Sequence, residues 1–477
     1  MLLRYFYDPK LAQASYFVGC QQTGEALVVD PARDVEPYLE AAEAEGMRIM
    51  GAAETHIHAD FVSGSRELAE RAGVTLFLSD CGDGNWKYQF AYEYDHVLLK
   101  DGDTFQVGNV MFETVHTPGH TPEHISFLMT DTAGADQAMG IFTGDFVFVG
   151  DVGRPDLLEK AAKMANTAEV GARQMFESLK WFKELSDYLQ VWPGHGAGSA
   201  CGKDLGAVPS STVGYEKLFN WALNQDDAEN FVRELLADQP EPPRYFAMMK
   251  KMNKEGPPIL GRLSMPEHKP FHRLEQALND DLPVVDTRTL SAFAASHIPG
   301  TINIPYDYSF PNWAGWLLPY DRPFYLIADH HALTEVTHDL ASIGLDNCAG
   351  YFETSAIEAW ASAGHELACY DVVRPTQIAN EVKSGDVTLI DVRSQSEWNE
   401  GHIPGAQHIM LGYLAERVEE IPTDRPVVVH CQTGARSAIG ASILQAEGFS
   451  EVANMMGGYR DWRLARLPVS DGETPTE

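Results

Sequence analysis

One stretch decides how the N-terminal half of this 477-residue chain is expected to fold: Thr55-His56-Ile57-His58-Ala59-Asp60-Phe61. A strand is expected to run into it, and side chains two residues apart on an extended segment point the same way. A single histidine is more often structural than metal-binding, because imidazole also serves as an ordinary buried polar group. A His-x-His-x-Asp cluster has few other uses and therefore indicates a metal site.

Three later segments supply matching residues: Thr117-Pro118-Gly119-His120, Phe142-Thr143-Gly144-Asp145 and Pro193-Gly194-His195. Each follows a strand-like run or a tight Pro-Gly turn, so loops at strand ends can bring all four segments to one metal. Strand-like runs are many and long helices few, which predicts an α/β fold of stacked sheets flanked by helices. The expected strands cover residues 2–7, 15–18, 26–30, 74–78, 97–99, 110–115, 125–129 and 140–142.

The identity of the metal is a question of ligand chemistry. Two imidazoles with one carboxylate suit non-haem Fe(II) that activates O2. Three histidines with one open position suit hydrolytic zinc. The sequence holds both sets, because His58 is able either to bind the metal or to support a neighbouring ligand, and spacing leaves this open.

The composition changes near residue 238, where a proline-rich segment begins. Proline pairs stiffen a chain and do not fit inside helices or central strands, so residues 238–261 are expected to be a linker with one short helix at 245–253. The chain then repeats itself: residues 284–305 and 389–409 both hold an apolar strand, Asp-x-Arg, a short helix and His-Ile-Pro-Gly. We therefore expect a metal-binding domain at 1–237 and two related α/β domains at 262–370 and 374–470.

The second copy contains a candidate chemical site in the loop Cys431-Gln432-Thr433-Gly434-Ala435-Arg436-Ser437. A cysteine between a strand and a helix faces backbone N–H groups that stabilise an anion such as a persulfide. Gly434 lets the backbone curl, Arg436 is a candidate charged donor, and Gly434 and Ser437 are expected to contact substrate. The alternative is a small apolar residue at a strand end.

The first copy lacks this site. Its corresponding strand ends at Asp329-His330-His331, which supplies no thiol, and its loop is expected to be shorter. We therefore expect a domain without sulfur-transfer activity.

Composition excludes several classes of function. The chain has 35 Lys and Arg against 69 Asp and Glu, a net charge of −34, which disfavours binding to nucleic acids and anionic membranes. No apolar run is long enough to span a bilayer, and the first ten residues lack the features of a signal peptide. The six cysteines form no CxxC pair, so a reducing cytoplasm fits best.

Taken together, the histidine and aspartate segments of residues 1–235 resemble the metallo-β-lactamase fold, an αββα sandwich. In dinuclear members of that family the first motif ends in a further histidine, and here Phe61 stands in its place. The resemblance therefore implies one metal. Residues 374–470 resemble the rhodanese family through Asp-x-Arg, Gly-His-Ile-Pro-Gly-Ala and Cys-x-x-Gly-x-Arg-Ser, which implies a persulfide on Cys431.

Nearly all of the chain resembles the bacterial fusions of a persulfide dioxygenase with a degenerate and an active rhodanese domain. This resemblance implies one Fe(II) per chain, low-molecular-weight persulfides such as glutathione persulfide and O2 as substrates, and sulfite as a product that Cys431 converts to thiosulfate. The implied metal ligands are His56, His120 and Asp145, and the residues implied to orient them are His58, Asp60 and His195.

Several roles stay open at this point. Arg154 is either a binder of a substrate carboxylate or a structural ion-pair residue, and Cys201 is either a catalytic thiol near the metal or a packed loop residue. Two other functions remain: a zinc-dependent thiolester or lactone hydrolase with an accessory sulfurtransferase, and a non-enzymatic sulfur-relay module. Homo-oligomerisation, the natural thiol carrier and the direction of sulfur transfer are not determined by the sequence.

Overall fold

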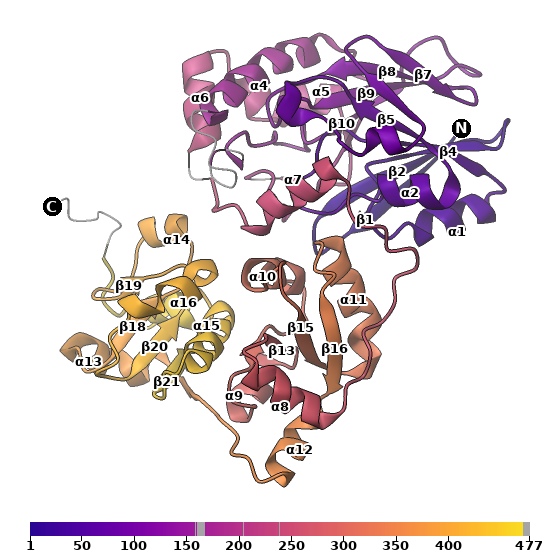
Figure 1. Cartoon of the computed structure of the whole chain (residues 1–477). Helices are drawn as coiled ribbons and strands as arrows, with labels where there is room; N and C mark the ends of the chain where they lie inside the picture. The colour runs from indigo at the N-terminus through magenta and orange to yellow at the C-terminus, as the bar shows by residue number, and fades with distance from the viewer. Residues whose placement is uncertain (158, 160–166, 204, 238, 471–477) are drawn as a thin grey trace. The chain divides into compact units, whose positions relative to one another are not determined.

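The structure is a computed structural model that describes residues 1–157, 159, 167–203, 205–237 and 239–470 (Figure 1). The chain forms two compact units. The first consists of Met1–Leu263 with Leu340–Gly344, and the second of Ser264–Asp339 with Leu345–Glu477.

The first unit is built on two six-stranded sheets, with strand orders β1-β2-β3-β4-β5-β6 and β12-β11-β10-β9-β8-β7. The strands are β1 (Leu2–Asp8), β2 (Gln13–Cys20), β3 (Glu25–Val29), β4 (Arg48–Ala53), β5 (Thr75–Ser79), β6 (His96–Leu99), β7 (Thr104–Val107), β8 (Val110–His116), β9 (Ile125–Asp131), β10 (Gly140–Gly144), β11 (Gln190–Pro193) and β12 (Ser211–Thr212). The helices are α1 (Glu36–Ala44), α2 (Ser65–Ala72), α4 (Thr167–Glu184), α5 (Val213–Phe219), α6 (Ala228–Leu236) and α7 (Tyr245–Glu255).

The apolar side chains of these strands divide into three layers. Tyr16 and Phe142 pack between the two sheets, whereas their neighbours Phe17 and Ile141 face the outer layers. Successive strand residues point to opposite faces, so each buried strand contributes to the inner core and to one outer core. Helices α1 and α2 cover one outer face, and α4 and α6 cover the other. The predicted αββα sandwich is confirmed.

The strand ends explain how distant segments meet. The stretch that begins at Thr55 follows β4, His120 follows β8, Asp145 follows β10 directly, and His195 follows β11. The loops after these strands bring the four segments predicted from the sequence together.

The proline-rich segment 238–261 belongs to the first compact unit. The helix expected at 245–253 is present as α7. Its residues Phe246 and Met249 are buried, and beyond the helix Arg66 donates hydrogen bonds to the carbonyl oxygens of Gly256 (3.2 Å) and Pro257 (3.0 Å). The segment is therefore packed against the domain that precedes it.

The second unit contains two parallel sheets, with strand orders β14-β13-β15-β16 and β17-β21-β20-β18-β19. Their strands are β13 (Val284–Asp286), β14 (Ile302–Asn303), β15 (Phe324–Ala328), β16 (Cys348–Glu353), β17 (Asp371–Val373), β18 (Thr388–Asp391), β19 (Gln407–His408), β20 (Val427–His430) and β21 (Val452–Met455). The helices are α8 (Phe271–Asn279), α9 (Leu290–Ala295), α10 (Phe310–Leu317), α11 (Leu333–Ser342), α12 (Ala356–Ser362), α13 (Pro375–Ser384), α14 (Gln395–Asn399), α15 (Ala435–Ala446) and α16 (Gly458–Leu464).

The sequence repeat is also a structural repeat. Strands β14-β13-β15-β16 lie in the same order as β19-β18-β20-β21. The Asp-x-Arg pairs match as well, because Arg288 donates to both carboxylate oxygens of Asp286 and Arg393 to both of Asp391. Each pair joins the end of a strand to the loop that follows it.

The two copies contact each other through helix α15. Most of this helix is buried, and the Ser442 hydroxyl accepts a hydrogen bond of 2.9 Å from the backbone N–H of Asn303 in β14. The first copy therefore packs against the helix that follows the Cys431 loop.

A search of the described residues finds no helix that is both long enough and apolar enough to cross a bilayer.

Candidate metal and sulfur-transfer sites

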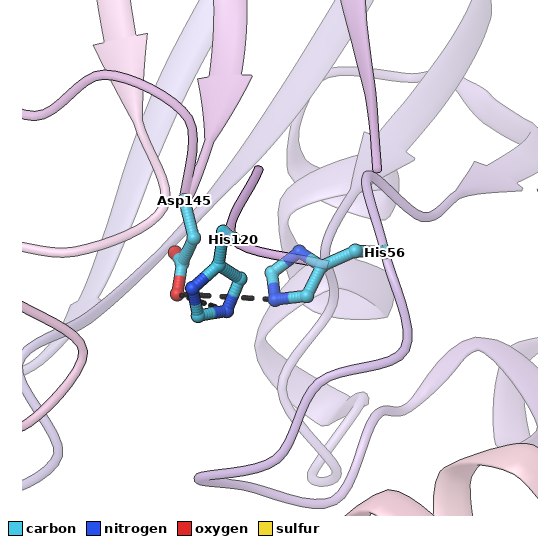
Figure 2. A group of neighbouring side chains, drawn as sticks. All are labelled: His56, His120 and Asp145. Carbon is cyan, nitrogen blue, oxygen red and sulfur yellow. Dashed lines mark ion pairs between the residues drawn. The ribbon is translucent and has the colours of Figure 1, made fainter. Parts of the chain in front are cut away.

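His56, His120 and Asp145 form a buried triad in the first unit (Figure 2). The Nε2 atoms of His56 and His120 lie 3.8 and 3.4 Å from the Oδ2 atom of Asp145. Each residue is at most 3% exposed. Figure 2 shows the two imidazoles turned toward the same carboxylate, although the three residues come from different loops.

Hydrogen bonds to the Nδ1 atoms hold both imidazoles in place. His120 Nδ1 donates to the carbonyl oxygen of Arg154 at 3.0 Å. His56 Nδ1 lies 3.0 Å from Thr55 Oγ1, which itself donates to Asp30 Oδ2, so Nδ1 is the donor in this pair. Because Nδ1 carries the proton in each ring, Nε2 presents a lone pair toward Asp145.

The carboxylate of Asp145 is only half satisfied. Its Oδ1 atom accepts a hydrogen bond of 2.7 Å from His195 Nδ1, whereas Oδ2 is buried without a hydrogen-bond partner. A buried carboxylate oxygen without a donor is costly. A cation between Oδ2 and the two Nε2 atoms would remove this cost, and these residues therefore fit a metal ion.

The titration behaviour of the triad agrees with this fit. Burial lowers the pKa of His56 and of His120, so both rings are neutral at neutral pH. Burial pushes the pKa of Asp145 upward, but the charge of His195 outweighs it and leaves this pKa well below its usual value. Two neutral imidazoles and one carboxylate are the donor set expected for non-haem Fe(II).

His58 stands outside the triad. Its Nε2 atom lies 3.1 Å from Asp30 Oδ1 and 3.1 Å from Glu54 Oε2, and its ring contacts Phe61 at 4.4 Å between centroids. Two carboxylate oxygens thus lie close to one nitrogen of His58. These contacts fit the supporting role that the sequence left open, rather than metal binding.

Asp60, His195 and Cys201 form a second buried group beside the triad. His195 Nε2 lies 2.6 Å from Asp60 Oδ2, and its Nδ1 holds Asp145, so His195 links the two groups. Burial lowers the pKa of His195, but Asp145 and Asp60 outweigh it and raise the pKa to about 10. The Cys201 thiol is brought close to the triad, as one of its two expected roles requires.

Arg154 lies close to the site, but its guanidinium is occupied. The side chain is fully buried, donates two hydrogen bonds of 2.7 Å to Asp156, and donates a third, of 3.3 Å, to the carbonyl oxygen of Ala200. These contacts fit the structural role, and the carboxylate that it binds belongs to the chain itself.

Three residues that shape the site were given no role from the sequence. His124 Nε2 accepts the backbone N–H of Asp145 at 3.1 Å, and its ring lies 5.0 Å from that of His56. Asp30 and Thr55 fix the orientation of His56. His124 lies four residues after His120, which was a usable signal, whereas Asp30 is remote in sequence.

The second site surrounds Cys431. Its Sγ atom accepts the backbone N–H of Gly434 at 3.1 Å and lies 3.5 Å from the Ser437 hydroxyl oxygen. Asn454 holds this loop, because it accepts from Ser437 (2.7 Å) and donates to the carbonyl oxygen of Gly434 (3.1 Å). Gly434 has φ = 107°, and a Cβ there would lie 3.0 Å from Met456 Cα. A glycine is therefore needed at this point of the loop.

Arg436 is paired. Its two terminal nitrogens lie 2.6 Å from the two carboxylate oxygens of Glu397, a bidentate ion pair. The sequence suggested that Arg436 is a charged donor to the sulfur. In the structure the carboxylate of Glu397 balances the charge of Arg436 and holds its guanidinium in place.

The corresponding loop of the first copy has the same length. Four residues separate β15 from α11, and four separate β20 from α15, so the expectation of a shorter loop is wrong. Asp329 takes the place of Cys431, and the backbone N–H of Ala332 bonds to the carbonyl oxygen of Asp329. The loop forms a 3-10 turn, so the N–H of Ala332 bonds within the turn. The matching N–H in the second copy, that of Gly434, is directed at Cys431 Sγ.

These features define an αββα domain with a candidate metal site, joined to α/β domains of which the second carries a candidate sulfur-transfer loop. The family model described as the metallo-β-lactamase superfamily matches residues 8–195, and the rhodanese-like domain model matches residues 374–465. The crystal structure of a metallo-β-lactamase from Staphylococcus aureus is 45% identical, with a TM-score of 0.67, and covers 74% of this chain and 99% of that one. The chain belongs to the metallo-β-lactamase superfamily and carries a C-terminal rhodanese-like domain.

Two curated relatives match the N-terminal domain. The mitochondrial persulfide dioxygenase ETHE1 of Bos taurus is 30% identical over 167 residues, which is 34% of this chain and 59% of the relative. The hydroxyacylglutathione hydrolase of a Synechococcus species is 30% identical over 171 residues, which is 36% of this chain and 59% of the relative. The chain therefore spans 59% of the length of each of these relatives.

Proposed function

We propose that this protein oxidises low-molecular-weight persulfides, such as glutathione persulfide, with O2 at one Fe(II) per chain, and that Cys431 transfers sulfane sulfur to sulfite. The observation that carries the first activity is the buried triad, in which two imidazole lone pairs face a carboxylate oxygen without a donor. This donor set is typical of non-haem Fe(II) oxygenases. The similarity to a persulfide dioxygenase and the rhodanese-like domain support the same choice.

His56, His120 and Asp145 would hold the iron. When bound, iron supplies a centre at which O2 and the terminal sulfur of a persulfide meet and exchange electrons. The reaction balances as RSSH, O2 and H2O giving RSH, SO3²⁻ and two H⁺. The chain contributes orientation, since hydrogen bonds fix both imidazoles and His195 fixes Asp145. Holding the reacting groups in a fixed geometry removes part of the entropic barrier.

Cys201 remains a candidate catalytic thiol of this domain. Its ligand atom belongs to the same buried group as Asp60 and His195, and that group is joined to the triad through Asp145. Burial raises the pKa of the Cys201 thiol well above its usual value, so it would act beside the bound metal as a protonated thiol, that is, as a hydrogen-bond or proton donor.

The second activity is a sulfur transfer through one cysteine. The Cys431 thiolate attacks the outer sulfur of a persulfide RSSH, the S–S bond breaks, and RSH leaves with the proton. Sulfite then attacks the outer sulfur of the new Cys431 persulfide, and the electron pair of that S–S bond returns to Sγ as thiosulfate leaves. The N–H of Gly434, which is directed at Sγ, stabilises the anions, and the Ser437 hydroxyl lies beside the sulfur at 3.5 Å.

The protein is proposed to act in a reducing compartment such as the cytoplasm. All six cysteines are free thiols in the structure, and structural disulfides are rare in such compartments. The net charge of −34 favours small-molecule substrates over nucleic acids and anionic membranes.

Metal analysis combined with an oxygen electrode tests the proposal. The purified protein should contain one iron per chain and consume O2 with glutathione persulfide. Replacing His120 by Ala should abolish O2 uptake and leave thiosulfate–thiol exchange at Cys431 intact, because the two sites lie in different units. Zinc without O2 uptake, together with thiolester cleavage, would support the hydrolase instead. Neither metal nor turnover would support a sulfur-relay module.

A further inference from the structure

Helix α7 makes a specific contact with the loop that carries the metal motif. Asn253 in this helix is 2% exposed. Its Nδ2 atom donates to the carbonyl oxygens of His58 (2.8 Å) and Phe61 (2.7 Å), and its Oδ1 atom accepts the backbone N–H of Ser63 (2.9 Å). One amide thus satisfies three main-chain groups, and only one orientation of the amide allows all three bonds.

The bonded groups lie on both sides of Asp60. The carbonyl of His58 precedes Asp60 in the chain and that of Phe61 follows it, so Asn253 determines the path of the backbone between them. That path sets where Asp60 meets His195, and His195 in turn holds Asp145. A displacement of this loop would therefore reach the triad by two routes, through the chain to His56 and through His195 to Asp145.

The start of the same loop is bonded by Glu123, a residue outside α7. The fully buried Glu123 accepts the backbone N–H of Ile57 at 2.9 Å. Burial raises the pKa of Glu123 to about 7, and the positive charge of Lys250 opposes that shift. The Lys250 ammonium itself lies over the Trp86 ring, 3.4 Å from its centroid. The start of the loop is therefore held from outside α7, and the contacts of α7 itself with the loop lie at His58, Phe61 and Ser63.

We propose that α7 is an integral part of the metal site and that Asn253 is a positioning residue for the loop from His56 to Ser63. This inference rests on the proposed assignment of the triad as metal ligands. The helix lies outside residues 8–195, which the metallo-β-lactamase family model matches. It follows that the N-terminal domain needs the segment up to at least Glu255 to bind its metal at full strength.

The test is the binding of Co(II) to the metal-free full-length chain, because its visible absorption reports ligand geometry without any turnover. The two variants are Asn253→Ala, which removes all three bonds, and Asn253→Asp, which keeps the acceptor for Ser63 but places an oxygen against two carbonyls. Asn220→Ala is the matched control. Asn220 is also fully buried and donates to the main chain, to the carbonyl oxygen of Asp151 at 2.9 Å, but does not contact the motif loop.

The dissociation constant for Co(II) should rise about 10- to 100-fold in both Asn253 variants, as for other partners of metal ligands. The absorption bands should shift as well, while sulfur transfer at Cys431, in the other unit, stays at the parent level. An unchanged far-UV circular dichroism spectrum and a cooperative urea transition of the metal-free variants show that the first unit is still folded. Asn220→Ala should keep the parent spectrum and dissociation constant. The inference fails if the Asn253 variants bind Co(II) like the parent, or if Asn220→Ala weakens binding equally. A parent protein that binds no Co(II) would instead contradict the proposed metal site itself.

Discussion

Replacing Cys431 by Ser should separate the two proposed activities. The side chain is 1% exposed, and a serine oxygen in its place can still accept the N–H of Gly434. The exchange keeps the volume of the site nearly constant, so the free energy of unfolding should change by less than about 1.5 kcal/mol. The triad lies in the other compact unit and keeps its geometry. The variant should therefore still consume O2.

The size of the effect follows from the stoichiometry of the two steps. Oxidation alone uses one persulfide for each O2 and releases sulfite. With the transfer step, a second persulfide donates its outer sulfur, so the parent uses two persulfides for each O2 and releases thiosulfate. Because Cys431 is the one thiol in the sulfur-transfer loop, the ratio of persulfide to O2 should fall by half in the variant.

The assay measures O2 uptake and then both anions by ion chromatography after complete turnover. Cys369→Ser serves as the control, because Cys369 is an exposed free thiol elsewhere in the same unit and should not change the ratio. A protein-free mixture of sulfite and persulfide gives the uncatalysed background. If the Cys431→Ser protein makes as much thiosulfate per O2 as the parent above that background, the two sites are not coupled as proposed.

Three further predictions concern the second unit. Asp329→Cys in a Cys431→Ser protein should show no sulfurtransferase turnover, because the 3-10 turn after Asp329 bonds its N–H to the backbone; turnover near the parent rate would refute this. Asn454→Ala should lower the free energy of unfolding by roughly 1–3 kcal/mol and slow thiosulfate–thiol exchange, because Gly434 loses its donor; an unchanged exchange rate would argue against it. Burial lowers the pKa of His430 below 6.5, so the unfolded chain takes up a proton there that the folded chain does not, and stability should fall as the pH drops below 6.5. Urea unfolding of His430→Gln should show a weaker loss over this range, and an identical loss in both proteins would contradict the assignment.

The residue types at the candidate sites could be recognised from the sequence because each motif is local. Histidine and aspartate at strand ends, and a cysteine before a Gly-containing turn, carry their chemistry within a few residues. The repeated Asp-x-Arg pairs are local too, since Arg288 and Arg393 bond to aspartates two positions away. The many strand-like runs and few long helices predicted stacked sheets flanked by helices, and the αββα order was implied by the resemblance to the metallo-β-lactamase fold.

Residue identity was less informative where a side chain had a choice of partners. Arg154 could have bound a substrate carboxylate, but in the structure it binds Asp156 and is sealed from solvent. Arg436 could have faced the sulfur, and it is paired with Glu397. The prediction of a shorter loop in the first copy was also wrong. The residue types did not indicate the 3-10 turn that fills the four positions between β15 and α11.

The sequence by itself determined the candidate histidine and aspartate motifs, the single cysteine of the transfer loop and the repeated Asp-x-Arg segments, since each of these depends on residues near one another in the chain. Only the tertiary structure decided which atoms are left without partners and which distant residues hold the ligands. Asp30 supports His56 through a hydrogen bond to Thr55. Asn253 bonds to the loop between His58 and Ser63, although it lies in a segment whose composition predicted a linker. Hydrogen bonds of this kind join groups that folding brings together, such as Asn253 and His58, which are 195 positions apart, and their geometry exists only once the layers have packed.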